Sequence, residues 1–284
     1  MSAPVLSGRA ALAGVVGDPV AHSLSPRLMA HWIDAAGLDA AYLPFAVAPD
    51  GFEIFVRGLA RSQLAGLNVT LPHKEAALAL ADRVSPVARA IGAANLLTFT
   101  ADGIRADNTD AAGFLAALEP TKIEYTQASA LVLGAGGAAR ALIHALVTSG
   151  VSQLTLANRT RERAEALAAE LAPKAAVVDW ETRDAALPEA DLVVNATALG
   201  LKGASELAMD WSRASAGTVV FDSVYTPLET GFLAGARAAG LTCIDGLDML
   251  IGQARPSFRA FFGQDAPQDP PVRPVLLTAL GERA

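Results

Sequence analysis

A glycine-rich stretch near the middle of the chain constrains its fold more than any other part of the sequence. Apolar residues Ala130–Leu133 run into three glycines, and AARALIHALV follows with apolar residues at helical spacing. This order predicts a strand, a tight turn and a helix. Gly134, Gly136 and Ala139 match the G-x-G-x-x-G/A pattern, in which small residues turn the backbone and let a pyrophosphate approach the helix N-terminus. The stretch therefore predicts a Rossmann-like dinucleotide-binding domain, with an ordinary glycine turn as the alternative.

The next predicted strand, Gln153–Thr160, indicates which dinucleotide is bound. A domain that prefers the unphosphorylated cofactor usually has an acidic residue at the end of this strand, which holds the ribose 2′-hydroxyl. Here the chain has Asn158 and Arg159, then Thr160, with Arg163 one turn further on. Because a guanidinium pairs bidentately with phosphate, these residues predict NADP. The alternative is a solvated basic helix start with Thr160 as its N-cap, and the two roles are compatible.

Length and charge limit the classes of protein to consider. With 284 residues the chain is long enough for two domains, and its net charge of −7 argues against nucleic acid or an anionic membrane as the main partner. Cys243 lies alone in an apolar run, where a buried strand residue is expected, and four scattered histidines argue against a metal site. The apolar run Ala10–Gly17 is broken by Asp18 and Pro19, which disfavours a signal peptide or membrane span. We therefore expect a soluble, cytoplasmic protein without a metal.

The first hundred residues alternate predicted strands and helices. Strand Ala11–Val16 is followed by a loop rich in glycine, proline and hydroxyls, and Ser25 with Pro26 predicts the N-cap and first turn of a helix to Ala36. Strand AYLPFAV, helix DGFEIFVRGLA and strand LAGLNVT come next. This alternation predicts a parallel or mainly parallel sheet, with the ligand at the carboxyl edge of its strands.

Lys74 follows the third of these strands, in the stretch NVTLPHKE. It is expected in the first turn of a helix, at the positive end of the helix dipole, where a carboxylate would be more favourable. The dipole favours the neutral amine and a nearby carboxylate would favour the ammonium, so a lysine between the two can give or take a proton. A surface lysine that snorkels from a helix start is the alternative.

Asp110 lies at the start of another predicted helix, which covers Ala111–Leu118. It is well suited to be the N-cap of that helix. The helix leads into the glycine-loop domain, so Asp110 is expected near the junction where cofactor and substrate would meet. Helix capping and catalysis are compatible at this position.

The rest of the chain continues a doubly wound pattern. An amphipathic helix is predicted over Arg161–Leu171, followed by further strands and a second helix. Polar residues at the predicted strand ends could face a ligand or form turns: Asn195, Thr197, Asp222 and Tyr225. An apolar helix with the amide of Gln253 follows, and Val275–Leu280 predicts a last helix that can fold back on the first domain.

Taken together, nine stretches closely resemble the shikimate dehydrogenase family, in the order GDPVAHSLSP, GLNVTLPHK, IGAAN, NTDAAG, GAGGAAR, NRT, NAT, DSVYTP and GLDMLIGQ. The resemblance covers about Gly17 to Gln253. It implies an α/β fold with an N-terminal substrate-binding domain, residues 1–110, whose sheet is mainly parallel and on which residues 248–284 pack. Residues 111–247 would form the Rossmann-like, doubly wound NADP-binding domain. The implied activity is the reversible reduction of 3-dehydroshikimate to shikimate with NADPH, in aromatic amino acid biosynthesis.

The resemblance also implies roles for individual residues. Lys74 would donate the proton during ketone reduction, and Asp110 would orient it and the hydroxyl. The substrate would be bound by Ser23, Ser25 and Tyr225 at its carboxylate, and by Asn68, Thr70, Asn95 and Gln253 at its ring hydroxyls. The cofactor would be bound by Gly134, Ala135, Gly136, Gly137 and Ala138 at the pyrophosphate, by Asn158, Arg159, Thr160 and Arg163 at the adenosine phosphate end, and by Ser223 and Gly246 at the nicotinamide. Trp32, Leu96 and Leu201 depart from the family pattern without removing a proposed contact.

Two other functions are compatible with the sequence. A dehydrogenase of the same family could act on quinate as well, with NAD, although Arg159 argues against NAD. A non-catalytic NADP-binding sensor is the second alternative, and the presence of both Lys74 and Asp110 argues against it. The oligomeric state is left open between a monomer and a homodimer.

Overall fold

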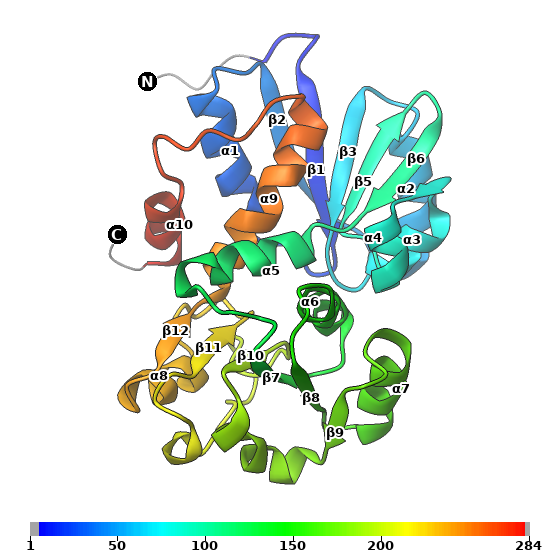
Figure 1. Ribbon diagram of the computed structural model, residues 1–284. Coiled ribbons are helices and arrows are strands. Elements are labelled where there is room, and N and C mark those ends of the chain that lie inside the picture. Colours follow the sequence, from blue (N-terminus) through cyan, green and yellow to red (C-terminus); the bar gives the residue numbers. More distant parts are fainter. Residues whose placement is uncertain (1–5, 282–284) are drawn as a thin grey trace. The chain divides into compact units, whose positions relative to one another are not determined.

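The computed structural model describes residues 6–281, and the chain divides into two compact units (Figure 1). The first unit combines the chain up to Thr109 with the part from Gln253 onward, and the second is Asp110–Gly252. Each unit contains a six-stranded sheet among these described residues. Within the same range, no helix is both long enough and apolar enough to cross a membrane.

The sheet of the first unit is mixed but mainly parallel, as predicted. Its strands lie in the order β2 (Ala40–Ala46), β1 (Ala11–Gly17), β3 (Leu64–Val69), β5 (Leu96–Thr100), β6 (Gly103–Asp107) and β4 (Arg83–Val84). The antiparallel strand β5, which pairs with both β3 and β6, was not predicted. A tight turn at Ala101 and Asp102 joins β5 to β6, and Gly103 after it has a positive φ of 107°.

Short helices flank this sheet: α1 (Ser25–Ala35), α2 (Phe52–Leu59), α3 (Lys74–Leu80), α4 (Pro86–Ile91) and α10 (Arg273–Leu280), with the 3₁₀ turn η1 (Pro49–Gly51) before α2. The inward face of α1 is apolar, because Leu28, Trp32 and Ile33 are buried. The predicted N-cap is wrong. Ser25 is the first helical residue, Leu24 occupies the cap position, and Ser23 Oγ accepts a 3.3 Å hydrogen bond from the Ser25 amide.

The sheet of the second unit is entirely parallel in the part of the chain described. Its strands lie in the order β12 (Thr242–Ile244), β11 (Val219–Asp222), β10 (Leu192–Asn195), β7 (Ser129–Leu133), β8 (Gln153–Ala157) and β9 (Ala176–Val178). The chain starts in the middle at β7, runs outward to β9, and returns through β10 to the other edge. This is the doubly wound order, and its switch point lies between β7 and β10.

The other elements of the second unit are α5 (Asp110–Leu118), η2 (Glu119–Thr121), α6 (Gly137–Thr148), α7 (Arg161–Leu171), η3 (Trp180–Glu189), η4 (Trp211–Arg213) and α8 (Gly231–Ala238). Helix α9 (Gly246–Phe262) contains the boundary between the units. Cys243 lies in β12 as predicted, but it is only partly buried.

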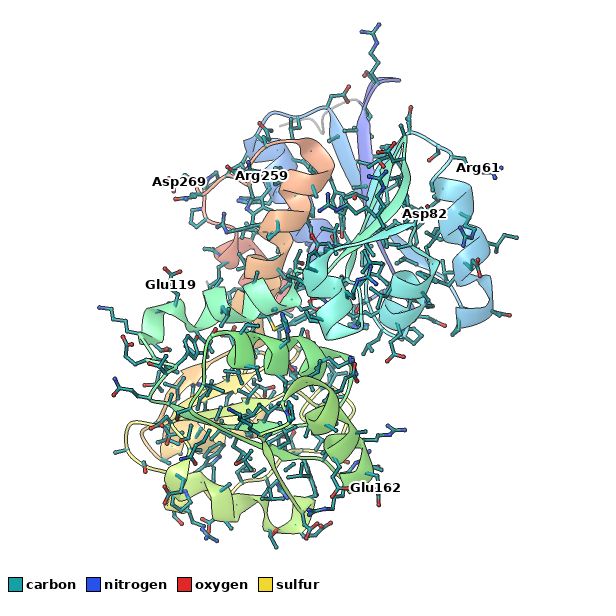
Figure 2. All side chains as sticks on the ribbon, turned by 45° about the vertical axis from the view of Figure 1, so that its right-hand side comes forward. Arg61, Asp82, Glu119, Glu162, Arg259 and Asp269 are labelled. Carbon is teal, nitrogen blue, oxygen red and sulfur yellow. The ribbon has the colours of Figure 1, made fainter. Side chains whose placement is uncertain are left out.

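Charged side chains lie at the periphery of each unit. Figure 2 shows Arg61 in the first unit pointing outward, as do Glu119 and Glu162 in the second, and all three are exposed. The interior of both sheets is apolar, so the few polar side chains that are buried need a structural or functional reason. They are concentrated at the ends of strands.

Candidate functional site

The glycine turn between β7 and α6 has the conformation that the sequence predicts. Gly134 has a φ of 113°, and a Cβ there would lie 3.0 Å from the carbonyl group of Ala196, so only glycine fits. By contrast, nothing lies within 4 Å of the Cβ positions at Gly136 and Gly137, where α6 begins. Ala139 is fully buried and lets the helix pack closely. The first turn of α6 therefore presents backbone N–H groups beside open space, which is an arrangement that binds phosphate.

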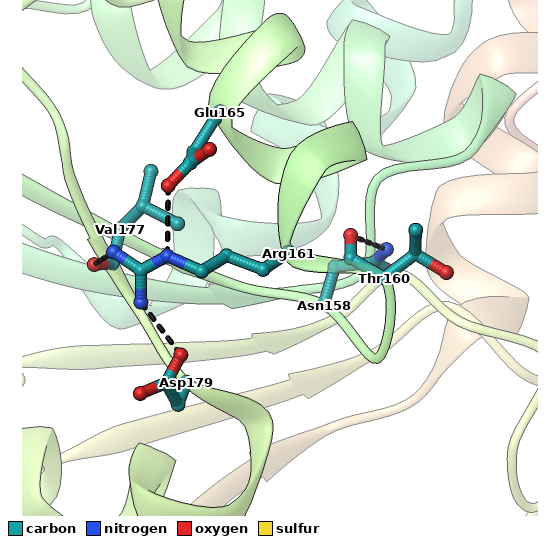
Figure 3. Close-up of polar contacts among 6 residues, drawn as sticks. All are labelled: Asn158, Thr160, Arg161, Glu165, Val177 and Asp179. Carbon is teal, nitrogen blue, oxygen red and sulfur yellow. Dashed lines mark hydrogen bonds and ion pairs between the residues drawn. The ribbon is translucent and has the colours of Figure 1, made fainter.

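The turn after β8 carries the residues predicted to select the cofactor. Asn158 Nδ2 donates a 2.8 Å hydrogen bond to the carbonyl oxygen of Thr160, which closes the turn (Figure 3). Arg159, Thr160 and Arg163 are exposed. Thr160 occupies the N-cap position of α7, but its side chain makes no capping hydrogen bond. The prediction that Thr160 is the N-cap residue of α7 is thus confirmed. Its hydroxyl, however, does not accept the hydrogen bond that a capping side chain would accept.

A third arginine in this turn was not singled out from the sequence. Arg161 makes ion pairs with Glu165 and Asp179, both at 2.7 Å (Figure 3). Glu165 lies one helical turn away, which spacing could have revealed. Asp179 lies beyond the next strand, so its contact could be found only in the structure.

In the first unit, Asn68 is the centre of a buried hydrogen-bond cluster at the end of β3. Its Oδ1 accepts a 2.8 Å bond from the Tyr42 hydroxyl. Its Nδ2 donates to the carbonyl oxygen of Asn95 at 3.2 Å and to Ser257 Oγ at 2.8 Å. Burial raises the pKa of Tyr42 well above its usual value, so the phenol stays protonated and acts as a donor. Asn68 was predicted from the sequence, whereas Tyr42 and Ser257 were not.

Asn95 extends this cluster toward the other predicted substrate residues of the first unit. Its Oδ1 accepts a 2.8 Å bond from the backbone amide of Thr109. Its Nδ2 lies 3.0 Å from Thr109 Oγ1 and 3.5 Å from Gln253 Oε1. The structure thus brings Asn68, Asn95 and Gln253 together from three distant segments, and adds Thr109 to them.

Lys74 is the first residue of α3, which confirms its predicted place in the first helical turn. It is partly buried. The preceding His73 is held firmly: its ring stacks on Phe52 with centroids 4.4 Å apart, and Nε2 lies 2.7 Å from the carbonyl oxygen of Val47. These contacts fix the backbone from which the lysine projects.

Three further residues predicted to bind substrate belong to the first unit. Ser23 precedes α1 and is partly buried, and Ser25 is 8% exposed. Thr70 directly follows β3 and is partly buried. Its methyl group would be 2.4 Å from a Cβ placed on Gly17, so the ends of β1 and β3 are closely packed here.

Asp110 belongs to the second unit, as the first residue of α5. The predicted N-cap is therefore wrong by one position, because the residue is already helical. It is 6% exposed, and a carboxylate in the first turn is stabilised by the helix dipole.

Asn195 and Asp222, at the ends of β10 and β11, form the second buried polar cluster. Asp222 accepts hydrogen bonds from Asn195 Nδ2 at 2.8 Å, from the Val224 amide at 2.9 Å and from Thr230 Oγ1 at 2.6 Å. Asn195 Oδ1 in turn accepts from the amide and hydroxyl of Thr197. Both side chains are fully buried, and their hydrogen bonds go to the segments that follow β10 and β11. Asn195 and Asp222 therefore stabilise turns, which was one of the two roles predicted for them, the other being to face a ligand.

Burial of Asp222 has an electrostatic consequence. Desolvation raises the pKa of its carboxyl from 3.8 to about 6, although the hydrogen bonds from Thr230, Val224 and Asn195 oppose the rise. The same network fixes the loop after β11. The Ser223 amide donates to the carbonyl oxygen of Asn195 at 3.0 Å, and a Cβ on Gly246 would lie 2.4 Å from the Ser223 carbonyl oxygen. Tyr225, two residues further on, is partly buried.

Comparison with known proteins identifies the family. Residues 15–97 match the model described as shikimate dehydrogenase substrate binding domain, residues 117–207 that of shikimate / quinate 5-dehydrogenase, and residues 246–270 that of the shikimate 5′-dehydrogenase C-terminal domain. A relative from Maricaulis maris, named shikimate dehydrogenase (NADP(+)), is 58% identical over 98% of this chain and 99% of its own length.

Solved structures agree. Shikimate 5-dehydrogenase from Thermus thermophilus, in complex with NADP(H) and shikimate, superposes with a TM-score of 0.82 at 39% identity, over 90% of this chain and 95% of that one. Quinate dehydrogenase from Corynebacterium glutamicum, in complex with NAD, has a TM-score of 0.84 at 32% identity, over 91% and 95% of the two chains. The residues of the family pattern, their places in the two units and these similarities lead to one conclusion: the chain belongs to the shikimate dehydrogenase family.

Proposed function

We infer that this chain is an NADP-dependent shikimate dehydrogenase, which reversibly reduces 3-dehydroshikimate to shikimate in aromatic amino acid biosynthesis. The observation that carries this function is the similarity along nearly the whole chain to enzymes named shikimate dehydrogenase (NADP(+)), 58% and 52% identical over 98% and 97% of its length. Within the family, we assign the substrate to the first unit and the cofactor to the second, which has the doubly wound sheet.

The second unit has the features that NADP requires. The start of α6, from Gly134 to Ala138, offers backbone N–H groups and open space for the pyrophosphate. Asn158, Arg159, Thr160 and Arg163 would hold the 2′-phosphate, and the backbone at Ser223 and Gly246 the nicotinamide. When bound, the cofactor supplies or accepts the hydride. The protein supplies orientation and the proton.

Shikimate would be recognised mainly by neutral groups. We assign Ser23, Ser25 and Tyr225 to its carboxylate, and Asn68, Thr70, Asn95 and Gln253 to its ring hydroxyls. The contacts of Asn68 limit what it can do: its two N–H groups already donate to Asn95 and Ser257, and Tyr42 occupies one lone pair of Oδ1. Its remaining lone pair can accept a hydrogen bond from a substrate hydroxyl. An analogue without that hydroxyl would leave a buried acceptor unpaired.

Lys74 is the proposed proton-transfer residue, and Asp110 is the proposed residue that orients it. The Lys74 ammonium would donate a proton to the carbonyl oxygen of 3-dehydroshikimate as the ketone is reduced. In the oxidation of shikimate, the neutral amine accepts that proton from the hydroxyl. Lys74 is the first residue of α3 and is partly buried. Asp110 would orient the lysine and the hydroxyl.

Quinate is a second candidate substrate, since the quinate dehydrogenase from Corynebacterium glutamicum has the same fold and covers most of the chain. The turn after β8 favours NADP, because Asn158 and Arg159 stand where an NAD-binding domain usually has an acidic residue. We therefore expect shikimate with NADP to be the best substrate pair.

A spectrophotometric assay of cofactor reduction tests the proposed function. Shikimate and quinate would each be tested with NADP and with NAD, and kcat/KM compared for the four pairs. A clear preference for shikimate with NADP supports the assignment. A higher kcat/KM for quinate with NAD would contradict both the substrate and our interpretation of Asn158 and Arg159. No turnover with any pair would favour the non-catalytic sensor.

For its surroundings we propose the cytoplasm, in keeping with a biosynthetic reaction. The net charge of −7 supports small molecules rather than nucleic acid as ligands. A monomer and a homodimer are both compatible with the chain, and sedimentation of the purified protein distinguishes them.

A further inference from the structure

Three arginines lie within five residues at the start of α7, and they do not play the same part. Arg159 and Arg163 are exposed, whereas the guanidinium of Arg161 is held by neighbouring groups. Its Nε donates to Glu165 Oε1 at 2.7 Å and its Nη1 to Asp179 Oδ1 at 2.7 Å. Figure 3 shows the third contact as well, from Nη2 to the Val177 carbonyl oxygen at 3.1 Å. All three nitrogens of Arg161 are thus in use, and they are directed to protein groups.

The strand register places one of these carboxylates beside the turn that would bind the 2′-phosphate. Strands β8 and β9 are parallel neighbours, and Ala157 pairs with Val178. Asn158 follows the first of these residues and Asp179 follows the second. Adjacent strands lie about 4.8 Å apart, so Asp179 leaves the sheet next to Asn158. Glu165 lies on α7 and accepts a hydrogen bond from the same guanidinium.

Carboxylates in this place oppose binding of a 2′-phosphate. A phosphate monoester carries a charge of about −1.5 to −2 at neutral pH, and two nearby carboxylates repel it. Domains that prefer NAD hold the ribose 2′-hydroxyl with an acid at the end of the strand before this turn, where this chain has Asn158 and Arg159. Asp179 belongs to the neighbouring strand end. The chain therefore contains an acid next to its cofactor turn, and that acid is engaged by Arg161.

We propose that Arg161 determines cofactor preference indirectly: it offsets part of the negative charge of Glu165 and Asp179, and so keeps the turn after β8 permissive for a 2′-phosphate without itself contacting the cofactor. This rests on the proposed function, which assigns that turn to NADP. Arg161 is in this sense a positioning residue, and its effect differs from that of Arg159 and Arg163, which would pair with the phosphate directly. Because Arg161 hydrogen-bonds to Asp179 and to Glu165, its pKa is raised and its charge persists at every working pH.

Binding of two cofactor fragments, measured by calorimetry on the full chain, tests this without relying on turnover. Adenosine 2′,5′-bisphosphate carries the 2′-phosphate and AMP lacks it. In Arg161→Ala, we expect the affinity for the bisphosphate to fall roughly three- to tenfold and that for AMP to change less than twofold, since partly exposed charges interact weakly across water. The loss should grow at low ionic strength, because salt screens such repulsion.

A variant that carries none of these three charges separates charge from shape. Arg161→Ala combined with Glu165→Gln and Asp179→Asn removes the arginine together with both acids, and we expect the bisphosphate affinity to return to within about twofold of the unaltered protein. Arg57→Ala is the control, because it also deletes an exposed arginine paired with a glutamate one turn away, at 2.8 Å, but in the first unit. It should leave the ratio of the two affinities unchanged.

Three results would overturn the proposal. Unchanged affinities for both fragments in Arg161→Ala remove the residue from cofactor selection. An equal loss for AMP and the bisphosphate, or a triple variant as weak as Arg161→Ala, assigns it to the shape of the turn alone. Failure of the proposed function is seen separately, as absence of NADP-dependent shikimate oxidation by the unaltered protein, and the fragments still report on Arg161 in that case.

Discussion

The two units of this chain bury polar side chains of different charge, although both place them at strand ends. In the first unit, Asn68 and Asn95 form a network of amides and hydroxyls. In the second unit, the corresponding network centres on a carboxylate, that of Asp222. Among residues 6–281, the buried carboxylates are Asp110 and Asp222, and both are assigned to the second unit.

This difference follows from what each group can do. An ionised carboxylate only accepts hydrogen bonds, so Asp222 suits a place where a side-chain amide, a backbone amide and a hydroxyl converge. An amide both donates and accepts, and it remains neutral. The network of the first unit can therefore exchange partners with the hydroxyls of a ligand at little electrostatic cost. The comparison predicts that substitutions in the first unit change substrate handling, and that those at Asp222 change the pH dependence of stability.

The largest effect is expected at Lys74, whose backbone carbonyl accepts a hydrogen bond from the amide of Ala94, the residue before Asn95. In Lys74→Ala, kcat should fall by about two to four orders of magnitude, the range for a proton-transfer group, while the affinity for NADP changes much less. Steady-state kinetics and cofactor titration measure the two quantities. Lys174→Ala, at an exposed site in the second unit, is the control and should retain kcat. Unchanged turnover in Lys74→Ala would remove the lysine from the mechanism.

The next largest effect concerns Asp222 and pH. Its folded-state pKa of about 6 lies above the usual 3.8, so the folded protein binds this proton more tightly than the unfolded chain does. The stabilising contribution is present below pH 3.8 and is lost as the pH rises through about 6. A shift of this size corresponds to roughly 3 kcal/mol.

Asp222→Asn should remove that dependence. The amide keeps an oxygen for Asn195 and Val224 but cannot titrate. Urea unfolding at a series of pH values, compared between the two proteins, isolates this single group from the other acids. Parallel stability curves for the two proteins between pH 4 and pH 7 would show that the carboxyl titrates normally. The comparison of the two units would then lose its electrostatic basis.

A smaller effect is expected for Asn95→Leu, in the neutral cluster. The substitution leaves the Thr109 amide without its buried acceptor, which costs about 1–3 kcal/mol in free energy of unfolding. The KM for shikimate should rise as well, if Asn95 contacts a ring hydroxyl. Urea unfolding and steady-state kinetics give the two values. A variant that is destabilised but has an unchanged KM would limit Asn95 to a structural role.

Much of the fold followed from the sequence because its signals are local. The bounds of α7 are those predicted, Arg161–Leu171, and the glycine turn at Gly134 is where its pattern indicated. Helix starts at Ser25 and Asp110 were wrong by one position, since the preference for a cap does not distinguish neighbouring residues. Strand β5 was missed because an antiparallel partner leaves no mark on the apolar pattern of the strand itself.

The candidate site depended far more on distant contacts. Resemblance to the family named Asn68 and Gln253, but nothing in the residues themselves indicated that they share a network. The hydrogen bond from Asn68 to Ser257 spans 189 residues of sequence, and that from Arg161 to Asp179 spans 18. Only the folded chain brings these partners together, so the supporting residues of both units became visible in the structure alone.

The smallest effect is expected when the neutral cluster loses one supporting hydroxyl, that of Tyr42. Tyr42→Phe removes the hydroxyl that donates to Asn68 Oδ1 and leaves the ring in place beside Phe261. The free energy of unfolding should fall by about 1 kcal/mol, the net value of one buried hydrogen bond. Tyr125→Phe, at a less buried tyrosine of the second unit, is the matched control. Because the phenol of Tyr42 is neutral, this loss should be independent of pH across the range in which Asp222 titrates. A pH-dependent loss would mean that charge also reaches the first cluster, and the contrast between the units would then be one of degree.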